Sequence, residues 1–203
     1  MGSARDHAGE PKPSTRRTNL SFEQQWYRNT VFAEPFWIEK AKALTEAAAK
    51  LERSIARGWA EDAKSRRSIH ALLPVYLMLT AYAVENILKA TIIARAREEL
   101  AGSLAKAHKL PERLRSHDLV DLARAASSHT LESPETEELL RRMSRSAIWY
   151  GRYPVPLSSE EFKPQKSASG ELQFLNHLSS RDVPAIKRIL RSLLREYAEV
   201  QAA

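Results

Sequence analysis

The feature that most constrains this chain is an apolar run at residues 71–94, which reads ALLPVYLMLTAYAVENILKATIIA. Its apolar side chains recur at three- and four-residue spacing around most of a helix, so such a helix must be buried in a bundle or in a membrane. The unbroken apolar part starts near Pro74 and ends at Glu85 and Asn86, short of the roughly 20 residues that a membrane span needs. We therefore predict the central helix of a soluble bundle, ending near Gly102.

Four other stretches have the apolar spacing of amphipathic helices. Pro35 suits the first turn of one, and Ser133, Pro134 and Glu135 open another in the order of a cap, a proline and an acid. No stretch shows the alternation of a β-strand. We predict an all-α fold, an antiparallel up-and-down bundle of about five helices. The four stretches are residues 35–56, 117–126, 133–148 and 182–200.

The length of 203 residues suits one domain with a core and is too short for two. Residues 1–20 are polar, charged and proline-bearing, and we expect a disordered tail there. Residues 21–203 are expected to form a single helical-bundle domain, with a polar, serine-rich excursion at residues 157–178. Near its start, Phe22, Trp26 and Tyr27 suggest a short element whose aromatic rings dock onto the body.

The composition excludes several classes of protein. There is no cysteine, which rules out disulfides and thiolate metal sites and favours a reducing compartment. The N-terminal region lacks the apolar core of a signal peptide, so we expect a cytoplasmic protein without a membrane anchor. The glycines form no phosphate-loop or dinucleotide fingerprint, and no two histidines are three or four residues apart, so neither a cofactor nor a metal is expected.

The charge balance points to acidic partners. The chain has 32 Lys and Arg residues against 25 Asp and Glu residues, for a formal net charge of +7. Such an excess favours nucleic acid or an anionic protein as a partner, although a solvated basic surface explains it equally well.

Three polar residues, Glu85, Asn86 and Lys89, interrupt the central helix. Glu85 and Lys89 have the favourable order for a pair at i and i+4. Either this face reaches the surface of the bundle, or it forms a polar cleft or a dimer contact where the bundle opens.

His117 and Asp118 stand at the start of a predicted helix. Both could be capping residues. Alternatively, the His117 imidazole is a general acid–base group that a neighbouring carboxylate holds in place.

Four more candidates lie at the end of the helix at residues 133–148 and just beyond it: Arg145, Tyr150, Arg152 and Tyr153. Together they suit an anion site or a base-stacking site. In the alternative interpretation Trp149 and Tyr153 anchor the core, and the arginines satisfy carbonyls at the helix end.

The last predicted helix carries a basic row of Lys187, Arg191 and Arg195 at i and i+4 spacing, with Arg188 beside it. Such a row can follow the phosphates of a nucleic acid. It is equally typical of the solvated face of an amphipathic helix, and no aromatic residue is interleaved to stack bases.

Three strings in order, AYAVENILKA, HDLVDLA and IWYGRYPVP, resemble the HEPN superfamily of small prokaryotic helical bundles. The resemblance covers roughly residues 35–156. It implies an up-and-down helical bundle that commonly dimerises. Many members are ribonucleases of toxin–antitoxin, phage-defence or RNA-processing systems, and others bind nucleotide, RNA or a partner protein without catalysis.

Catalytic members of the superfamily carry an Arg and, about four to six residues later, a His on a late helix. Here Arg145 is followed by Trp149 and Tyr150, and no His occurs between His129 and His177. The one literal match to this Arg–His spacing is Arg124 with His129, which lies on the wrong helix for the family motif. In an arginine-rich chain, a two-residue spacing this loose matches by chance.

We therefore expect a HEPN-like homodimer with a degenerate ribonuclease motif, acting as a binding or regulatory module for RNA or nucleotide. The first alternative is a metal-independent endoribonuclease with an atypical site that uses His117 and Arg145. The second is a non-catalytic bundle that binds a partner protein. The predicted cleft consists of Glu85, Asn86, Lys89, Asp118, Tyr150, Arg152 and Tyr153.

Overall fold

The protein is described by a computed structural model. Within the described residues the regular structure is helical apart from one short strand pairing, so the all-α prediction is confirmed. The tail predicted at residues 1–20 lies outside the described residues, as does much of the predicted excursion. The described residues are 21–60, 66–107, 109–153, 158–166, 170, 172–173 and 181–203.

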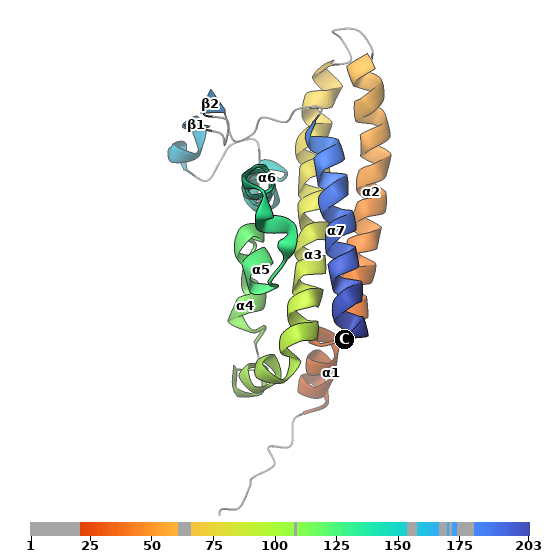
Figure 1. Ribbon diagram of the computed structural model, residues 1–203, viewed down its shortest axis with the longest axis vertical. Helices are drawn as coiled ribbons and strands as arrows, with labels where there is room; N and C mark the ends of the chain where they lie inside the picture. Colours follow the sequence, from red (N-terminus) through yellow and green to blue (C-terminus); the bar gives the residue numbers. More distant parts are fainter. Residues whose placement is uncertain are drawn as a thin grey trace, which may run out of the picture.

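The longest described helix, α3 (Arg66–Ala107), forms the axis of the molecule (Figure 1). α2 (Glu34–Ala60) lies along it in the opposite direction, whereas α7 (Asp182–Ala202) runs in the same direction as α3. The strictly antiparallel order that we predicted therefore does not describe α7. The reason is that α4 to α6, on the other side of α3, lead the chain back toward the end where α3 begins (Figure 1).

α3 supplies much of the core because its apolar residues surround the helix. Tyr76, Leu77, Ile87, Leu88 and Ile92 are each only 1% exposed. Small residues complete the packing and let α2 and α7 approach closely. The fully inaccessible small residues of α3 are Ala81, Ala83 and Ala90.

By length and composition, the 31-residue stretch Leu72–Gly102 would suffice to cross a membrane, contrary to the prediction that the run is too short. The count from sequence stopped at Glu85 and Asn86, but the helix continues without a break through these residues. Since 72% of its most apolar window is buried inside the protein, the burial is that of a core helix.

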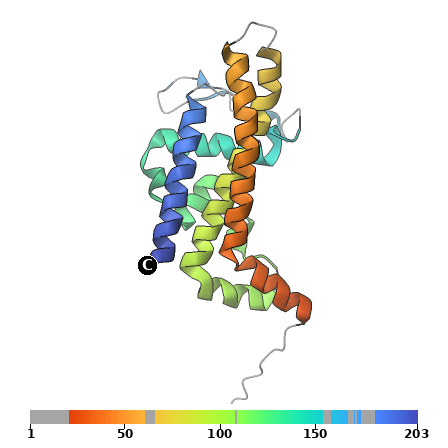
Figure 2. The same cartoon turned by 90° about the vertical axis from the view of Figure 1, so that its right-hand side faces the viewer.

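The end of α3 also differs from the prediction, because the helix passes Gly102 and continues to Ala107. It bends at Ala96, whose φ of −124° and ψ of 28° are not helical. After this bend the last turns of α3 leave the long axis of the molecule (Figure 2).

Seven α-helices lie within the described residues, because α1 (Phe22–Val31) and α4 (Glu112–Arg115) add to the main helices. The prediction that aromatic rings of α1 dock onto the body is wrong for Phe22 and Trp26, whose exposed fractions are 82% and 63%. Val31 and the following Phe32 are buried instead.

The helices beside α3 begin where local signals place them. α5 (Leu119–Ala125) has Asp118 as its N-cap, with a carboxylate that accepts two backbone N–H groups of the first turn. α6 (Pro134–Arg145) follows a Ser133 cap and lies across the long axis (Figure 2). A short 3-10 helix (His129–Glu132) lies between the two, and α6 continues as a π-helical turn (Ser146–Tyr150).

Part of the predicted excursion has regular structure. A 3-10 turn covers Ser159–Phe162. β1 (Gln165–Lys166) then pairs antiparallel with β2 (Leu172–Gln173). This two-residue pairing was not predicted, because strands so short have no alternation to detect.

Candidate functional site

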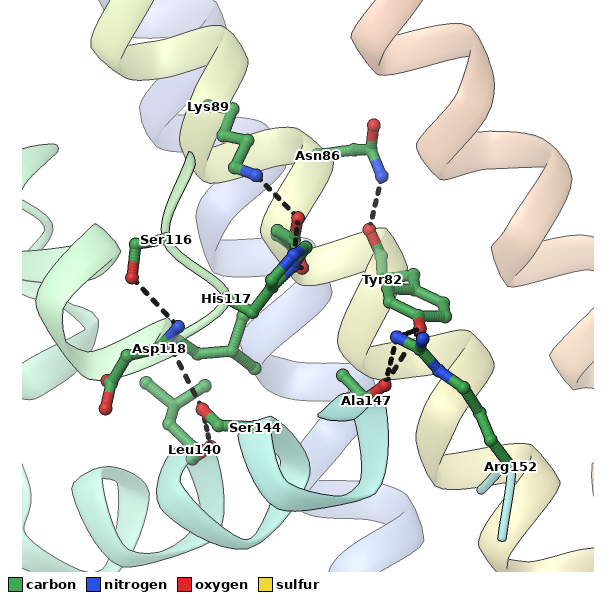
Figure 3. A network of polar contacts seen from close by, with 12 residues as sticks. Tyr82, Asn86, Lys89, Ser116, His117, Asp118, Leu140, Ser144, Ala147 and Arg152 are labelled. Carbon is green, nitrogen blue, oxygen red and sulfur yellow. Dashed lines mark hydrogen bonds and ion pairs between the residues drawn. The ribbon is translucent and has the colours of Figure 1, made fainter. Parts of the chain in front are cut away.

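The centre of the candidate site is the carboxylate of Glu85 on α3. Lys89, one turn later, donates to it with an Nζ–Oε1 distance of 2.6 Å. Nδ1 of His117, in the connection between α4 and α5, lies 3.0 and 3.1 Å from its two oxygens (Figure 3). A contact between residues 32 positions apart thus joins the start of α5 to the central helix.

Glu85 and Lys89 are only 6% and 3% exposed, so the interpretation that this face reaches the surface of the bundle is wrong for these two residues, whereas Asn86 is half-buried. Two opposite charges are tolerated beside the core because each satisfies the other and His117 bonds the same carboxylate. Lys89 thus holds the Glu85 carboxylate, and this carboxylate fixes the orientation of the His117 ring.

The His117 side chain is 52% exposed, although its ring is anchored. A carboxylate accepts a hydrogen bond from Nδ1–H, and in this tautomer Nε2 carries the lone pair that can accept a proton. A histidine oriented in this way by a carboxylate is the usual arrangement for general acid–base chemistry. The holding carboxylate comes from α3, not from the adjacent Asp118.

Asp118 acts as a cap, as one interpretation predicted. Its Oδ1 accepts from the backbone N–H groups of Val120 and Asp121 at 2.9 and 3.0 Å. His117 makes no such capping bond in the described structure, so the idea that both residues cap the helix is wrong for His117.

A serine that the sequence did not single out connects this helix start to α6. Oγ of Ser144 accepts from the Leu119 N–H at 2.9 Å and donates to the Leu140 carbonyl at 2.9 Å (Figure 3). The residue is 4% exposed. Ser144 therefore fixes the position of the segment that carries His117, yet nothing in its sequence neighbourhood signals this contact.

Beside His117 is a pocket of about 220 Å³ between α5 and α6. Asp118, the residue after His117 in the chain, lines it together with Arg145, whereas His117 itself is not among the lining residues. Arg124 contacts Asp121 at 3.4 Å and Glu137 at 3.1 Å. The full lining is Asp118, Val120, Asp121, Arg124, Arg141 and Arg145.

Arg152 belongs to a second polar cluster, built on Tyr82 of α3. Its guanidinium donates to the Tyr82 hydroxyl and, at 2.6 Å, to the Ala147 carbonyl (Figure 3). It also lies 5.5 Å from the centroid of the Tyr82 ring. Arg152 thus satisfies a carbonyl near the end of α6, as the alternative interpretation predicted, and Tyr82 was missed.

Of the two predicted tyrosines, only Tyr153 has a side chain that the structure describes. Tyr153 is 51% exposed, which excludes a core anchor. The side chains of Trp149 and Tyr150 lie outside what the structure describes.

The basic row of α7 is separate from the His117 site and is partly neutralised. Lys187 pairs with Glu52 of α2 at 3.0 Å. Arg191 donates to the Lys187 carbonyl at 3.2 Å, and Arg195 lies 4.0 Å from Glu199. Arg188 is exposed beside them.

Comparisons with known proteins do not identify a function, so the geometry of the site is the guide to it. No family model, curated protein or solved structure matches the chain. Among the residues that the structure describes, no three His, Asp or Glu side chains gather as a metal site would require. The site offers an imidazole oriented by Glu85 and, starting at the following residue Asp118, a pocket with three arginines, which are suited to phosphate groups.

Proposed function

We propose that the protein is a HEPN-like binding protein for RNA or nucleotide, and that it contacts phosphate at the arginine pocket beside His117. The observation that carries this proposal is that Arg124, Arg141 and Arg145 line one pocket. Each guanidinium has five N–H donors in a planar fork that matches phosphate oxygens.

The acidic residues in and around this pocket affect how it would bind phosphate. Asp118 and Asp121 lie in the lining, and Glu137 pairs with both Arg124 and Arg141. These carboxylates hold the guanidinium groups in position and offset part of their charge. We therefore expect recognition of one or two phosphates through directed hydrogen bonds, with a weak dependence on salt.

The HEPN assignment within this proposal is supported by the three strings in the sequence and by the all-α fold around α3. The proposal includes a homodimer and a role in a prokaryotic defence or toxin–antitoxin system, as the resemblance implies. Sedimentation of the purified chain tests the dimer directly.

The binding test measures fluorescence anisotropy of a labelled single-stranded RNA at several salt concentrations. Arg141→Ala and Arg145→Ala are expected to weaken binding several-fold, because each removes a charge-assisted hydrogen bond. Arg188→Ala is the comparison, since it removes the same charge from the row on α7. A larger loss for Arg188→Ala than for both pocket variants would contradict the proposal.

A second candidate function, metal-independent RNA cleavage, is favoured by the 3.0 Å contact between His117 and Glu85. Nε2 of His117 would take the proton from a ribose 2′-hydroxyl, whose oxygen attacks the adjacent phosphorus. The bond from phosphorus to the 5′-oxygen breaks, and that oxygen takes a proton from water. The products are a 2′,3′-cyclic phosphate and a 5′-hydroxyl end, and the Arg145 guanidinium would stabilise the charge on the phosphorane.

The cleavage test incubates RNA with the protein in EDTA over a range of pH. If the candidate is right, the wild type cleaves and His117→Ala loses at least about 100-fold in rate, as expected for loss of a general base. Intact RNA with the wild type at every pH would exclude cleavage and leave the binding function standing.

A further inference from the structure

A second pocket, of about 340 Å³, lies where α1, α2 and α3 meet. Its volume falls within the roughly 300–1,000 Å³ typical of small-ligand sites. It occupies the face of α3 next to the His117 site, because Asn86 lines it while the adjacent Glu85 bonds His117. The lining residues are Tyr27, Thr30, Val31, Phe36, Trp37, Lys40, Asn86 and Leu110.

The chemistry of the lining suits a planar ring that carries a negative group. Tyr27, Phe36 and Trp37 are three aromatic side chains around one space. Among the lining residues that the structure describes, Lys40 is the one that is charged, and none carries a carboxylate. An anionic aromatic ligand would therefore meet stacking surfaces and one ammonium group without electrostatic repulsion.

Asn86 adds a directional hydrogen-bonding group to this mostly apolar pocket. Its Nδ2 donates to the Tyr82 carbonyl at 2.6 Å. Its Oδ1 accepts no hydrogen bond from the residues that the structure describes, and in Figure 3 it points away from Tyr82. A nucleobase edge with an N–H group would fill this acceptor.

The ring of Trp37 is held in place and connects the two sites. Its Nε1 donates to the Val31 carbonyl at 3.0 Å. The Lys89 ammonium lies 5.9 Å from the centroid of the ring and also bonds Glu85, the carboxylate that holds His117. A ligand stacked on Trp37 would thus contact the same ring that Lys89 lies against, and Lys89 bonds the Glu85 carboxylate that orients His117.

The aromatic surface continues out of the pocket along α1. Trp26 lies one turn before the pocket residue Thr30, and Phe22 one turn before Trp26. Their exposed fractions of 63% and 82% are high for such large apolar groups. A row of exposed aromatic rings at this spacing is typical of surfaces on which successive unpaired bases stack.

We infer that the pocket binds an unpaired base of single-stranded RNA, and that Trp26 and Phe22 stack the neighbouring bases. The inference rests on the proposed function and names its ligand class. RNA is favoured over a protein partner by the single positive charge of the lining, the open amide acceptor and the net charge of +7. A duplex is excluded as the ligand because its bases are already stacked and paired.

The test measures binding of a labelled single-stranded RNA of about 12 nucleotides, and of its duplex, to the full chain. Trp26→Ala, Phe22→Ala and Asn86→Ala are compared with the wild type. Leu172→Ala is the matched control, since it truncates an apolar side chain of 68% exposure on β2. Circular dichroism confirms that each variant keeps its helices.

The expected result is a roughly five- to 150-fold loss of single-strand affinity for Trp26→Ala, because stacking contributes about 1–3 kcal/mol per base. Phe22→Ala and Asn86→Ala should show smaller losses, Leu172→Ala none, and the duplex should bind more weakly than the single strand. Wild-type affinity in both Trp26→Ala and Phe22→Ala would overturn the inference. Loss of self-association in these variants, with RNA binding intact, would overturn it in favour of an interface between copies.

The same titration separates this inference from the proposed function. Loss of affinity in Arg141→Ala and Arg145→Ala alone would support the arginine pocket and overturn the stacking site. Loss of affinity in Trp26→Ala alone would support the stacking site and overturn the arginine pocket. A wild-type chain that binds no RNA at any salt concentration would overturn both.

Discussion

Arg142 of α6 and Asp182 of α7 form a two-point ion pair, with nitrogen–oxygen distances of 2.9 and 3.1 Å. Their side chains are 10% and 11% exposed, so the pair is almost entirely removed from water. Its geometry matches the bidentate contact that an arginine makes with a carboxylate. It fastens the first turn of α7 to the helix that leads to Arg145 and Arg152.

We predict that Arg142→Ala lowers the free energy of unfolding by about 3–5 kcal/mol, because it leaves the Asp182 carboxylate buried without this partner. Urea unfolding followed by circular dichroism measures the change. The control is Arg141→Ala, one residue earlier, whose side chain is 58% exposed and should change stability by about 1 kcal/mol or less. Equal effects of the two substitutions would contradict the prediction.

The buried pair of Glu85 and Lys89 makes a similar prediction for the candidate site. Glu85→Gln leaves the Lys89 ammonium buried without a counter-charge, and we expect a loss of about 3–5 kcal/mol in the free energy of unfolding. Adding Lys89→Met should recover most of this loss, since an apolar side chain of similar length then fills the space. Chemical denaturation of both variants checks the sign, and a double variant less stable than Glu85→Gln would refute the argument.

Local signals in the sequence were sufficient for much of the fold. The apolar circumference of residues 71–94 identified the central helix, and the Ser133-Pro134 pair marked the start of α6. Asp118 was recognised as a cap because capping depends on residues two or three positions away. These features depend on neighbours in the chain, which is why spacing reveals them.

The contacts that build the candidate site depend instead on tertiary packing. The i and i+4 spacing of Glu85 and Lys89 predicted their pairing, but no spacing predicts that the same carboxylate also bonds His117, 32 positions later. Ser144 and Tyr82 were missed for the same reason, since their partners lie 25 and 65 residues away. The exposure of Trp26 could not be predicted either, because an aromatic residue near a bundle usually packs onto it.

Gly151, just beyond the π-helical turn, is predicted to be intolerant of any side chain. A Cβ atom there would lie 2.4 Å from the Met78 Cβ on α3, far inside van der Waals contact. We expect Gly151→Ala to destabilise the protein by about 1–3 kcal/mol, as overpacking does. Thermal unfolding measures this loss, with Gly102→Ala as the control because, outside its own helical turn, no atom of the described residues lies within 4 Å of its added Cβ.

A second substitution tests the cause of that loss. Met78→Ala should restore little stability to Gly151→Ala, because alanine keeps the Cβ atom that makes the closest contact. Met78→Gly removes that atom, and should recover stability apart from the roughly 1 kcal/mol that glycine costs within a helix. Full recovery with Met78→Ala would show that the clash lies elsewhere along the side chain.

Tyr76 is predicted to control the stability of the protein in alkaline solution. Burial raises the pKa of its hydroxyl well above the ordinary value of 10.0, and the negative charge of Glu52 raises it further. Below pH 10 the phenol is protonated in both states and contributes no pH dependence. Above pH 10 the unfolded chain loses this proton while the folded chain keeps it, so the free energy of unfolding falls by up to about 1.4 kcal/mol per pH unit.

Tyr76→Phe removes this group while keeping the ring, so stability should fall less steeply above pH 10 than in the wild type. Some slope should remain, because burial and then Glu34 also raise the pKa of Tyr197. Tyr153→Phe, at a half-exposed position, serves as the matched control. Urea titrations between about pH 8 and pH 11 measure the difference, and identical slopes for Tyr76→Phe and the wild type would show that the Tyr76 phenol ionises equally in both states.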